Sequence, residues 1–422
     1  MREYNWDKKF AQYFFELVSL SPIAIVLGNL LPPIGLRIHY FLFGILFIIS
    51  CIWLASNAHK KWILYVSGFY LIVQATLWEW NIKSYIDFFF GPFILMVLLD
   101  IYWKNLIPTK KLKEYTNRFV ILAMVPISIA VLQFIGILPF QFLDADYVNF
   151  RIYSDGTRTP RPNGFLYHGS ELCIIIYYMA VMQIHRNAKL ALPLLGLFLF
   201  FGYTTLYKSI LGTLIILILF YIVFIDRQVF GKIKVWTANR LYSYLSFGTL
   251  LVAAILIGYF SIVYSYTGRF FHDQLLTGRG AIWNIYFEGI KDFSVWNVLF
   301  GSGVGSEFSI FKNYATPELF YPLRISPILY DVHGTHNTLL SIFINSGIVG
   351  VGFIISIFYF IFKDLNGLIK DRQFKKKVIA FIIIPVFTFG ITIPILEMAI
   401  FWPLIGFSII LWAESKSIER EI

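Results

Sequence analysis

The sequence alternates between long apolar stretches and short polar segments that hold most of the charge. A helix that crosses a membrane needs about 20 mostly apolar residues, and about twelve stretches approach that length. The pattern predicts an all-α, polytopic helical membrane protein in which residues 1–422 form a single integrated membrane domain. The predicted spans cover residues 11–31, 36–56, 62–80, 84–103, 119–139, 165–184, 190–207, 209–225, 244–266, 338–362, 378–393 and 394–414.

The composition supports this class of protein. Of the 422 residues, 58% are apolar and only 14% are charged, so the chain has too few charges to cover the surface of a soluble protein of this length. Aromatic residues at 19% suit lipid-facing walls and interfacial belts. The same composition excludes disordered, collagenous and coiled-coil chains. Cys51 and Cys173 lie in apolar runs without a neighbouring Cys or His, which argues against a disulfide framework or a structural zinc site.

The positions of Lys and Arg predict the orientation of the spans, because cytoplasmic loops carry an excess of positive charge. With both termini in the cytoplasm, about two thirds of the 35 Lys and Arg residues lie on that side. Two long segments then lie outside, residues 140–164 (the first external loop) and 267–337 (the second external loop). Arg outnumbers Lys outside, and the guanidinium group is the better bidentate ligand for phosphate. The charge pattern therefore indicates an anion site on the external face.

The first external loop is basic and conformationally restricted. Pro160 and Pro162 bracket an arginine, and proline fixes the backbone φ angle. A restricted arginine at the mouth of a membrane cavity suits a lipid diphosphate, whereas a loop that only binds lipid headgroups is the simpler alternative. An Asp-x-Asp pair, Asp144 and Asp146, is a weaker candidate for a metal site in the same loop. The arginines of the loop are Arg151, Arg158 and Arg161.

Polar residues also occur at the ends of the neighbouring spans. His168 and Glu171 are three residues apart at the start of a predicted span, which places them on one helix face. They could line a cavity or could simply be interfacial residues. Lys208 lies at the external end between two predicted spans and is a candidate for a further phosphate contact.

The second external loop contains a possible anion site. Helical periodicity over residues 280–293 puts Arg279 at the N-terminus of a helix, beside free backbone amides. The run Gly301-Ser-Gly303-Val-Gly305 follows, and its glycines allow another backbone to approach closely. It lacks the Gly-Lys-Ser/Thr ending of a nucleotide phosphate loop.

The second external loop ends with a possible general base. His336 precedes a predicted span, and the unperturbed pKa of histidine is about 6.5, which suits proton transfer. A metal site formed by Asp331, His333 and His336 is one alternative. A plain helix cap formed by Thr335 or Asn337 is the other.

Together these segments resemble the O-antigen polymerase and O-antigen ligase superfamily of bacterial inner-membrane glycosyltransferases. The similarity covers roughly residues 150–365, and the chain departs from it at His168-Gly169-Ser170, where many relatives carry a Pro-Asn pair. The matching pieces are Arg161-x-x-Gly164-Phe, Thr277-Gly-Arg279-x-x-x-Trp283, Leu-Phe-Gly301-x-Gly303, and Thr335-His336-Asn337-x-x-Leu340 followed by Gly347-Ile-x-Gly350.

The resemblance implies a metal-independent membrane glycosyltransferase with a GT-C-like helical fold and no cofactor. Its donor would be a glycan on undecaprenyl diphosphate, presented at the periplasmic face of the bacterial inner membrane. Arg161 and Arg279 would bind the diphosphate, and His336 would be the base or would orient the acceptor, which makes Arg279 and His336 the expected catalytic residues. The other expected substrate-binding residues are Arg158, Arg269, His333, Asn337, Lys208, Tyr167 and His168.

The resemblance also defines the expected partners and the alternatives. The partners are the lipid-linked glycan donor and acceptor, membrane lipids and a chain-length regulator, with no nucleic acid. A polymerase joins lipid-linked repeat units to one another, whereas a ligase transfers the finished glycan to lipid A core; we favour the polymerase. A transporter or flippase for lipid-linked oligosaccharide is the third possibility, but it predicts similar halves and charges scattered through the spans.

Overall fold

The structure is a computed structural model, and nearly all of the regular structure that it describes is helical. The prediction of a helical fold is therefore confirmed, with one short β-hairpin as an addition. The described residues are 2–30, 38–56, 60–78, 82–138, 150–152, 158–160, 162–166, 169–186, 188–204, 279–303, 305–315, 335, 337–368, 372–390, 398 and 400–418.

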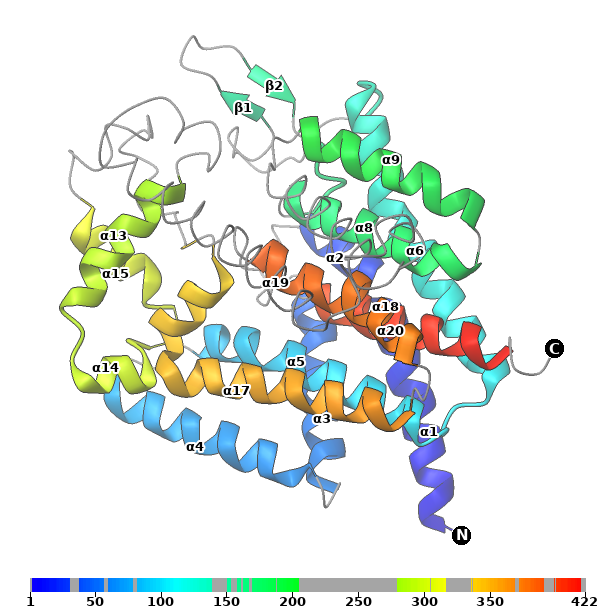
Figure 1. Ribbon diagram of the computed structural model, residues 1–422, viewed down its shortest axis with the longest axis horizontal. Helices are drawn as coiled ribbons and strands as arrows, with labels where there is room; N and C mark the ends of the chain where they lie inside the picture. The colour runs from blue at the N-terminus through cyan, green and yellow to red at the C-terminus, as the bar shows by residue number, and fades with distance from the viewer. Residues whose placement is uncertain are drawn as a thin grey trace, which may run out of the picture.

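The helices follow the predicted spans in order along the chain (Figure 1). The two predicted spans at residues 209–225 and 244–266 lie outside the described residues. The N-terminal helices are α1 (Arg2–Ser19), α2 (Ser21–Leu30), α3 (Ile38–Ser56), α4 (Lys61–Leu77), α5 (Ile82–Trp103), α6 (Thr109–Phe134), α8 (Gly169–Arg186) and α9 (Ala188–Thr204). The C-terminal helices are α13 (Arg279–Lys291), α14 (Val295–Phe300), α15 (Glu307–Tyr314), α17 (Thr338–Leu368), α18 (Arg372–Val378), the π-helix η5 (Ile379–Ile383), α19 (Ile384–Gly390) and α20 (Phe401–Ile418).

Some of the described helices are long and apolar enough to cross a membrane. Thr109–Phe134 and Thr338–Ile361 meet that test alone, and α1 with α2 meets it if the two helices form one bent span. Shorter apolar helices, of 10–17 residues, occupy several of the other predicted spans, among them Tyr40–Ser56 and Lys61–Leu77. These helices support a membrane protein, and the arrangement with about twelve spans stays a prediction.

The first predicted span differs from the structure, because it is two helices rather than one. The axes of α1 and α2 differ by 44° across a break at Leu20. Pro22 lies in the first turn of α2 and has no amide hydrogen to donate to the preceding turn, which favours a break or a bend of the helix at this point.

The first external loop contains the only β-hairpin in the described part of the chain. Strands β1 (Phe150–Ile152) and β2 (Arg158–Pro160) are antiparallel. The register pairs Arg151 with Thr159 and places Arg158 opposite Ile152. The two arginines are therefore not directly opposite one another across the hairpin.

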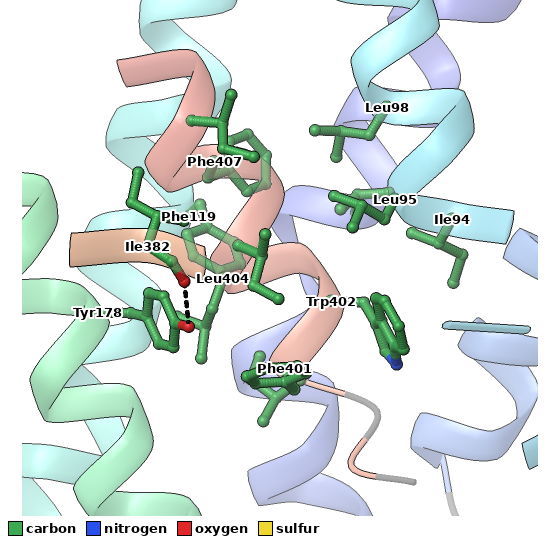
Figure 2. Packing of buried hydrophobic residues seen from close by; sticks show 14 of the residues in the cluster. Ile94, Leu95, Leu98, Phe119, Tyr178, Ile382, Phe401, Trp402, Leu404 and Phe407 are labelled. Carbon is green, nitrogen blue, oxygen red and sulfur yellow. Dashed lines mark hydrogen bonds between the residues drawn. The ribbon is translucent and has the colours of Figure 1, made fainter. Parts of the chain in front are cut away.

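Helix α20 lies in the middle of the main hydrophobic core. Its buried aromatic residues include Trp402 and Phe407, which pack among side chains from α5, α6 and α8 (Figure 2). A Cβ atom added to Gly91 of α5 would lie only 2.0 Å from the Trp402 indole ring, so the absence of a side chain at this position lets α5 and α20 approach closely.

The π-helix η5 is joined to α8 by two buried phenols. Pro385 cannot donate a hydrogen bond to the carbonyl group four residues earlier, that of Phe381. The Tyr177 hydroxyl donates to this carbonyl oxygen at 2.9 Å. The adjacent Tyr178 hydroxyl donates to the Ile382 carbonyl oxygen, also at 2.9 Å (Figure 2). Side chains from α8 thus satisfy backbone groups where the α-helical pattern is interrupted.

Candidate functional site

Parts of the second external loop pack against the start of α17. We call the described residues within 279–315 and 335–347 the loop assembly. Figure 1 shows α13, α14 and α15 grouped at one end of α17. A small hydrophobic cluster, separate from the main core, packs α13 and α15 against α17. Its buried members are Ile282, Trp283, Ile285, Tyr286, Ile310, Phe311 and Ile344.

Trp283 joins two of the motifs that the sequence analysis identified. Its side chain is buried, and its Nε1–H donates to the Thr335 carbonyl oxygen at 2.8 Å. Arg279 is the first residue of α13, as predicted, and lies one helical turn before Trp283. The N-terminal turn of α13 is therefore next to the chain segment that leads into α17.

The glycine run makes a backbone-to-backbone contact with a kink in α17. Gly301 has φ +80°, and an added Cβ atom would lie 2.2 Å from the Ser346 nitrogen. The kink itself is at Gly347, with φ 64° and ψ −165°, where an added Cβ would lie 2.4 Å from the Leu299 carbonyl carbon. The predicted close approach is confirmed, and α17 is the element that approaches.

A backbone carbonyl and a side chain just before this kink accept hydrogen bonds in the contact. The Ser302 amide donates to the Ile344 carbonyl oxygen at 2.7 Å. The Gly305 amide donates to Asn345 Oδ1 at 3.1 Å. Because both loop amides are bonded to α17, the glycine run is a structural joint in which these two donors are already occupied.

Helix α4 supports the same joint from a distant part of the sequence. Gln74 is buried, and its Nε2 donates to the Phe300 carbonyl oxygen at 2.5 Å. Gly303 packs on Trp78, whose Cβ atom would lie 3.1 Å from an added Cβ. A glutamine in an apolar run is expensive to place in lipid, and this was the signal in the sequence that could have identified Gln74.

Glu307 is a buried carboxyl group that sequence reasoning missed. It is the first residue of α15, its exposure is 5%, and it accepts a hydrogen bond from the Thr335 amide at 3.2 Å. Burial raises its pKa above the ordinary value of a glutamate, and hydrogen bonds from Thr335 and Ser341 oppose that shift. In the sequence, Glu307 looks like an ordinary acidic residue in the first turn of a helix, so no local signal distinguishes it.

Asn337 caps α17, which confirms the helix-cap alternative for this residue. Its Oδ1 accepts from the Leu340 amide at 3.0 Å. The Thr335 hydroxyl donates to the Asn337 carbonyl oxygen at 3.0 Å. A role for Asn337 in substrate binding stays a prediction.

The end of the Arg161-x-x-Gly164-Phe motif is fixed to α6. The amides of Asn163 and Gly164 both donate to the buried Gln133 Oε1, at 3.1 and 2.9 Å. Gly164 has φ +64°, and an added Cβ would lie 2.1 Å from the Pro126 carbonyl oxygen. Only glycine fits this position.

The structure describes few of the predicted site residues in full. Arg279 and Arg158 are described by their backbone, at the start of α13 and in β2. Most of the others lie outside the described residues, namely His336, His333, Arg161, Arg269, Lys208, Tyr167 and His168, together with the metal candidates Asp144, Asp146 and Asp331. Among the side chains that the structure does describe, no group of three or more His, Cys, Asp or Glu could hold a metal ion.

Comparison of the chain with protein-family models and with curated proteins finds no match. The resemblance to the O-antigen polymerase and ligase superfamily therefore stays a prediction, based on the motifs alone.

Proposed function

We propose that this protein polymerises lipid-linked oligosaccharide repeat units of the O-antigen or capsular type at the periplasmic face of a bacterial inner membrane. It would transfer the glycan from undecaprenyl diphosphate to a hydroxyl group of the acceptor sugar. The observation that carries the proposal is the hydrogen bond from Trp283 to Thr335, because it joins two motif segments that lie 52 residues apart.

This contact supports a shared site for the two expected catalytic residues. Arg279 begins the helix that carries Trp283, and His336 directly follows Thr335 in the chain. The first turn of α13 also presents free backbone amides and the positive end of the helix dipole, which favour a diphosphate. The contact between Trp283 and Thr335 therefore supports the proposal that the predicted anion-binding residue and the predicted base act at one site.

The proposed reaction needs a general base and cationic groups that bind the diphosphate. The acceptor hydroxyl attacks the anomeric carbon of the donor glycan, and a new glycosidic C–O bond forms. The bond from that carbon to the diphosphate oxygen breaks, and undecaprenyl diphosphate leaves with the electron pair. His336 accepts the hydroxyl proton, while Arg279 and Arg161 stabilise the negative charge that develops on the diphosphate. The activated bond arrives with the lipid, so the reaction uses no nucleotide.

The deciding experiment incubates the purified protein with a lipid-linked repeat unit, in the presence of EDTA and without nucleotide. A ladder of lipid-linked polymers is the expected product. Glycan that appears only after lipid A core is added would identify a ligase instead. Movement of the lipid-linked unit across vesicles without a covalent product would identify a transporter. Activity that is lost in EDTA and restored by a divalent ion would revive the metal sites at Asp144 and Asp146 or at His333 and His336.

A further inference from the structure

A buried polar network joins α15 to the start of α17. It consists of Glu307, Thr335, Ser341 and Asn345, and each of these residues is at most 5% exposed. Asn345 Nδ2 donates to the Ser341 hydroxyl oxygen at 3.2 Å, and Asn345 Oδ1 accepts from the Gly305 amide at 3.1 Å. A buried network of this kind is retained only if its members satisfy one another, so the network fixes the relative position of its segments.

Glu307 is the ionisable residue of this network. Its Oε2 accepts from the Thr335 amide at 3.2 Å, and Ser341 also hydrogen-bonds to the carboxyl group. Thr335 is simultaneously held from α13, through its carbonyl oxygen and Trp283 Nε1. The amide and the carbonyl of one residue are therefore fixed by two different helices.

The next fixed point along the chain is Asn337, which caps α17 through the Leu340 amide. Thr335 and Asn337 are the residues on either side of His336 in the sequence. Glu307 and Trp283 therefore hold the residue before His336, and the cap of α17 holds the residue after it.

We propose that Glu307 is a positioning residue for the glycosyl transfer. By holding Thr335, it fixes the residue that directly precedes His336, the proposed base, in the chain. This inference rests on the proposed function, because it gives His336 a chemical role. A displacement of about 1 Å in a reacting group can lower turnover by about 100-fold, so a buried hydrogen bond two peptide groups away is sufficient to control the rate.

The test compares three substitutions of Glu307 in the full-length protein. Glu307→Gln keeps an oxygen that accepts from the Thr335 amide, so its kcat should stay within about threefold of the wild type. Glu307→Asp shortens the side chain by one methylene group and should lower kcat by roughly 10-fold. Glu307→Ala removes the acceptor and should lower kcat by about 100-fold. The KM for the lipid-linked donor should change by less than about threefold in every case, because the diphosphate site is not altered.

The matched control is Glu288→Ala. Glu288 is a partly exposed glutamate on α13 that pairs with Lys291 at 2.6 Å and is not one of the four network residues. Its loss should leave kcat and KM unchanged. If the three Glu307 variants lose folding stability in proportion to their loss of kcat, or if Glu307→Asp is active while Glu307→Gln is not, then positioning by this hydrogen bond is wrong.

Hydrogen exchange separates this inference from the proposed function. Exchange in a peptide that contains the Thr335 amide should be at least about 10-fold faster in Glu307→Ala and unchanged in Glu288→Ala. Faster exchange with a normal kcat would overturn the positioning role. Unchanged exchange would overturn the contact itself. A wild-type protein that makes no polymer would overturn the proposed function and the positioning role together, and the exchange rates would still show whether the contact exists.

Discussion

The two ends of α4 are attached to the rest of the protein in different ways. At its N-terminal end, Lys60 forms an ion pair with Asp100 at 3.0 Å, and Asp100 also pairs with Lys104 at 2.9 Å and accepts from Trp53 at 2.8 Å. At its C-terminal end, Gln74 contacts the joint in which Gly301 packs on α17. We call the first the ionic end and the second the glycine end.

The ionic end and the glycine end therefore differ in how much movement of α4 they tolerate. Lysine side chains are long and flexible, so an ion pair can survive small shifts of the helices. A contact between two backbones has no such freedom, because an added Cβ atom would overlap the facing chain. The glycine end adjoins the loop assembly, where the proposed reaction would require its groups to be held to well within about 1 Å. The ionic end lies among segments predicted to be cytoplasmic, where a structural role is sufficient.

The largest expected effect concerns Arg279, at the start of α13 in the loop assembly that adjoins the glycine end. Arg279→Ala should reduce polymer formation by about 1,000-fold, because it removes one of the two guanidinium groups proposed to stabilise the charge that develops on the diphosphate. Arg279→Lys should recover little, since an ammonium group cannot bind phosphate bidentately. Lys291→Ala, at the other end of α13 and 67% exposed, is the matched control and should retain full activity. Wild-type polymer from Arg279→Ala would refute the proposed anion site.

His336 should show the next largest effect. His336→Ala removes the proposed base and should lower kcat by roughly 100-fold or more, with little change in donor affinity. Donor binding is measured separately from turnover with the lipid-linked unit alone. If affinity falls while turnover of the bound donor persists, the residue binds substrate and is not the base.

The joint at the glycine end predicts a loss of stability. Gly301→Ala should lower the free energy of unfolding by about 3 kcal/mol, because the new methyl group overlaps the α17 backbone and φ +80° is unfavourable for alanine. Gly352→Ala is the control, since nothing lies within 4 Å of a Cβ atom at that position of α17. Thermal unfolding in detergent distinguishes the two variants. Equal stability would mean that the joint is not rigid.

The ionic end should be less sensitive. Asp100→Asn should lower the free energy of unfolding by about 1–2 kcal/mol, because Lys104 is already 46% exposed and can reach water. Polymer formed per folded molecule should not change. Glu114→Gln breaks only the exposed pair with Arg118 and should cost about 0.3 kcal/mol. A loss of turnover in Asp100→Asn without unfolding would contradict the division between the two ends.

The positions of many helices could be predicted, because length and hydropathy are local properties. The predicted spans at residues 62–80 and 84–103 correspond to α4 and α5 within a few residues. The break at Leu20 was missed because the residues on both sides of it are similarly apolar, although Pro22 marks the place. The π-helix was also missed, since it depends on partners in α8 that lie about 200 residues earlier.

The site could be predicted where the signal is local: helical periodicity for the start of α13, a capping residue type for Asn337, and glycine where the backbone is restricted. The glycine run indicated a close approach, and Gly301 makes one. The identity of the facing backbone, at Ser346, could not be read from the sequence, because it depends on how distant segments pack. Glu307 and Gln133 were missed for the same reason. Each is an ordinary polar residue in its local sequence and gains its role from a partner 28 or more residues away.

The two phenols that join α8 to η5 have a consequence for how the chain is made. Helix α8 is synthesised long before the segment whose carbonyl oxygens accept from Tyr177 and Tyr178. A hydroxyl group in hydrocarbon without an acceptor costs several kcal/mol, on the order of 2–7. A ribosome-bound chain that stops before Ile379 therefore contains α8 without these two acceptors. Synthesis of η5 then supplies an acceptor for each of the two hydroxyl groups. The segment that forms η5 thus also completes the hydrogen bonding of α8.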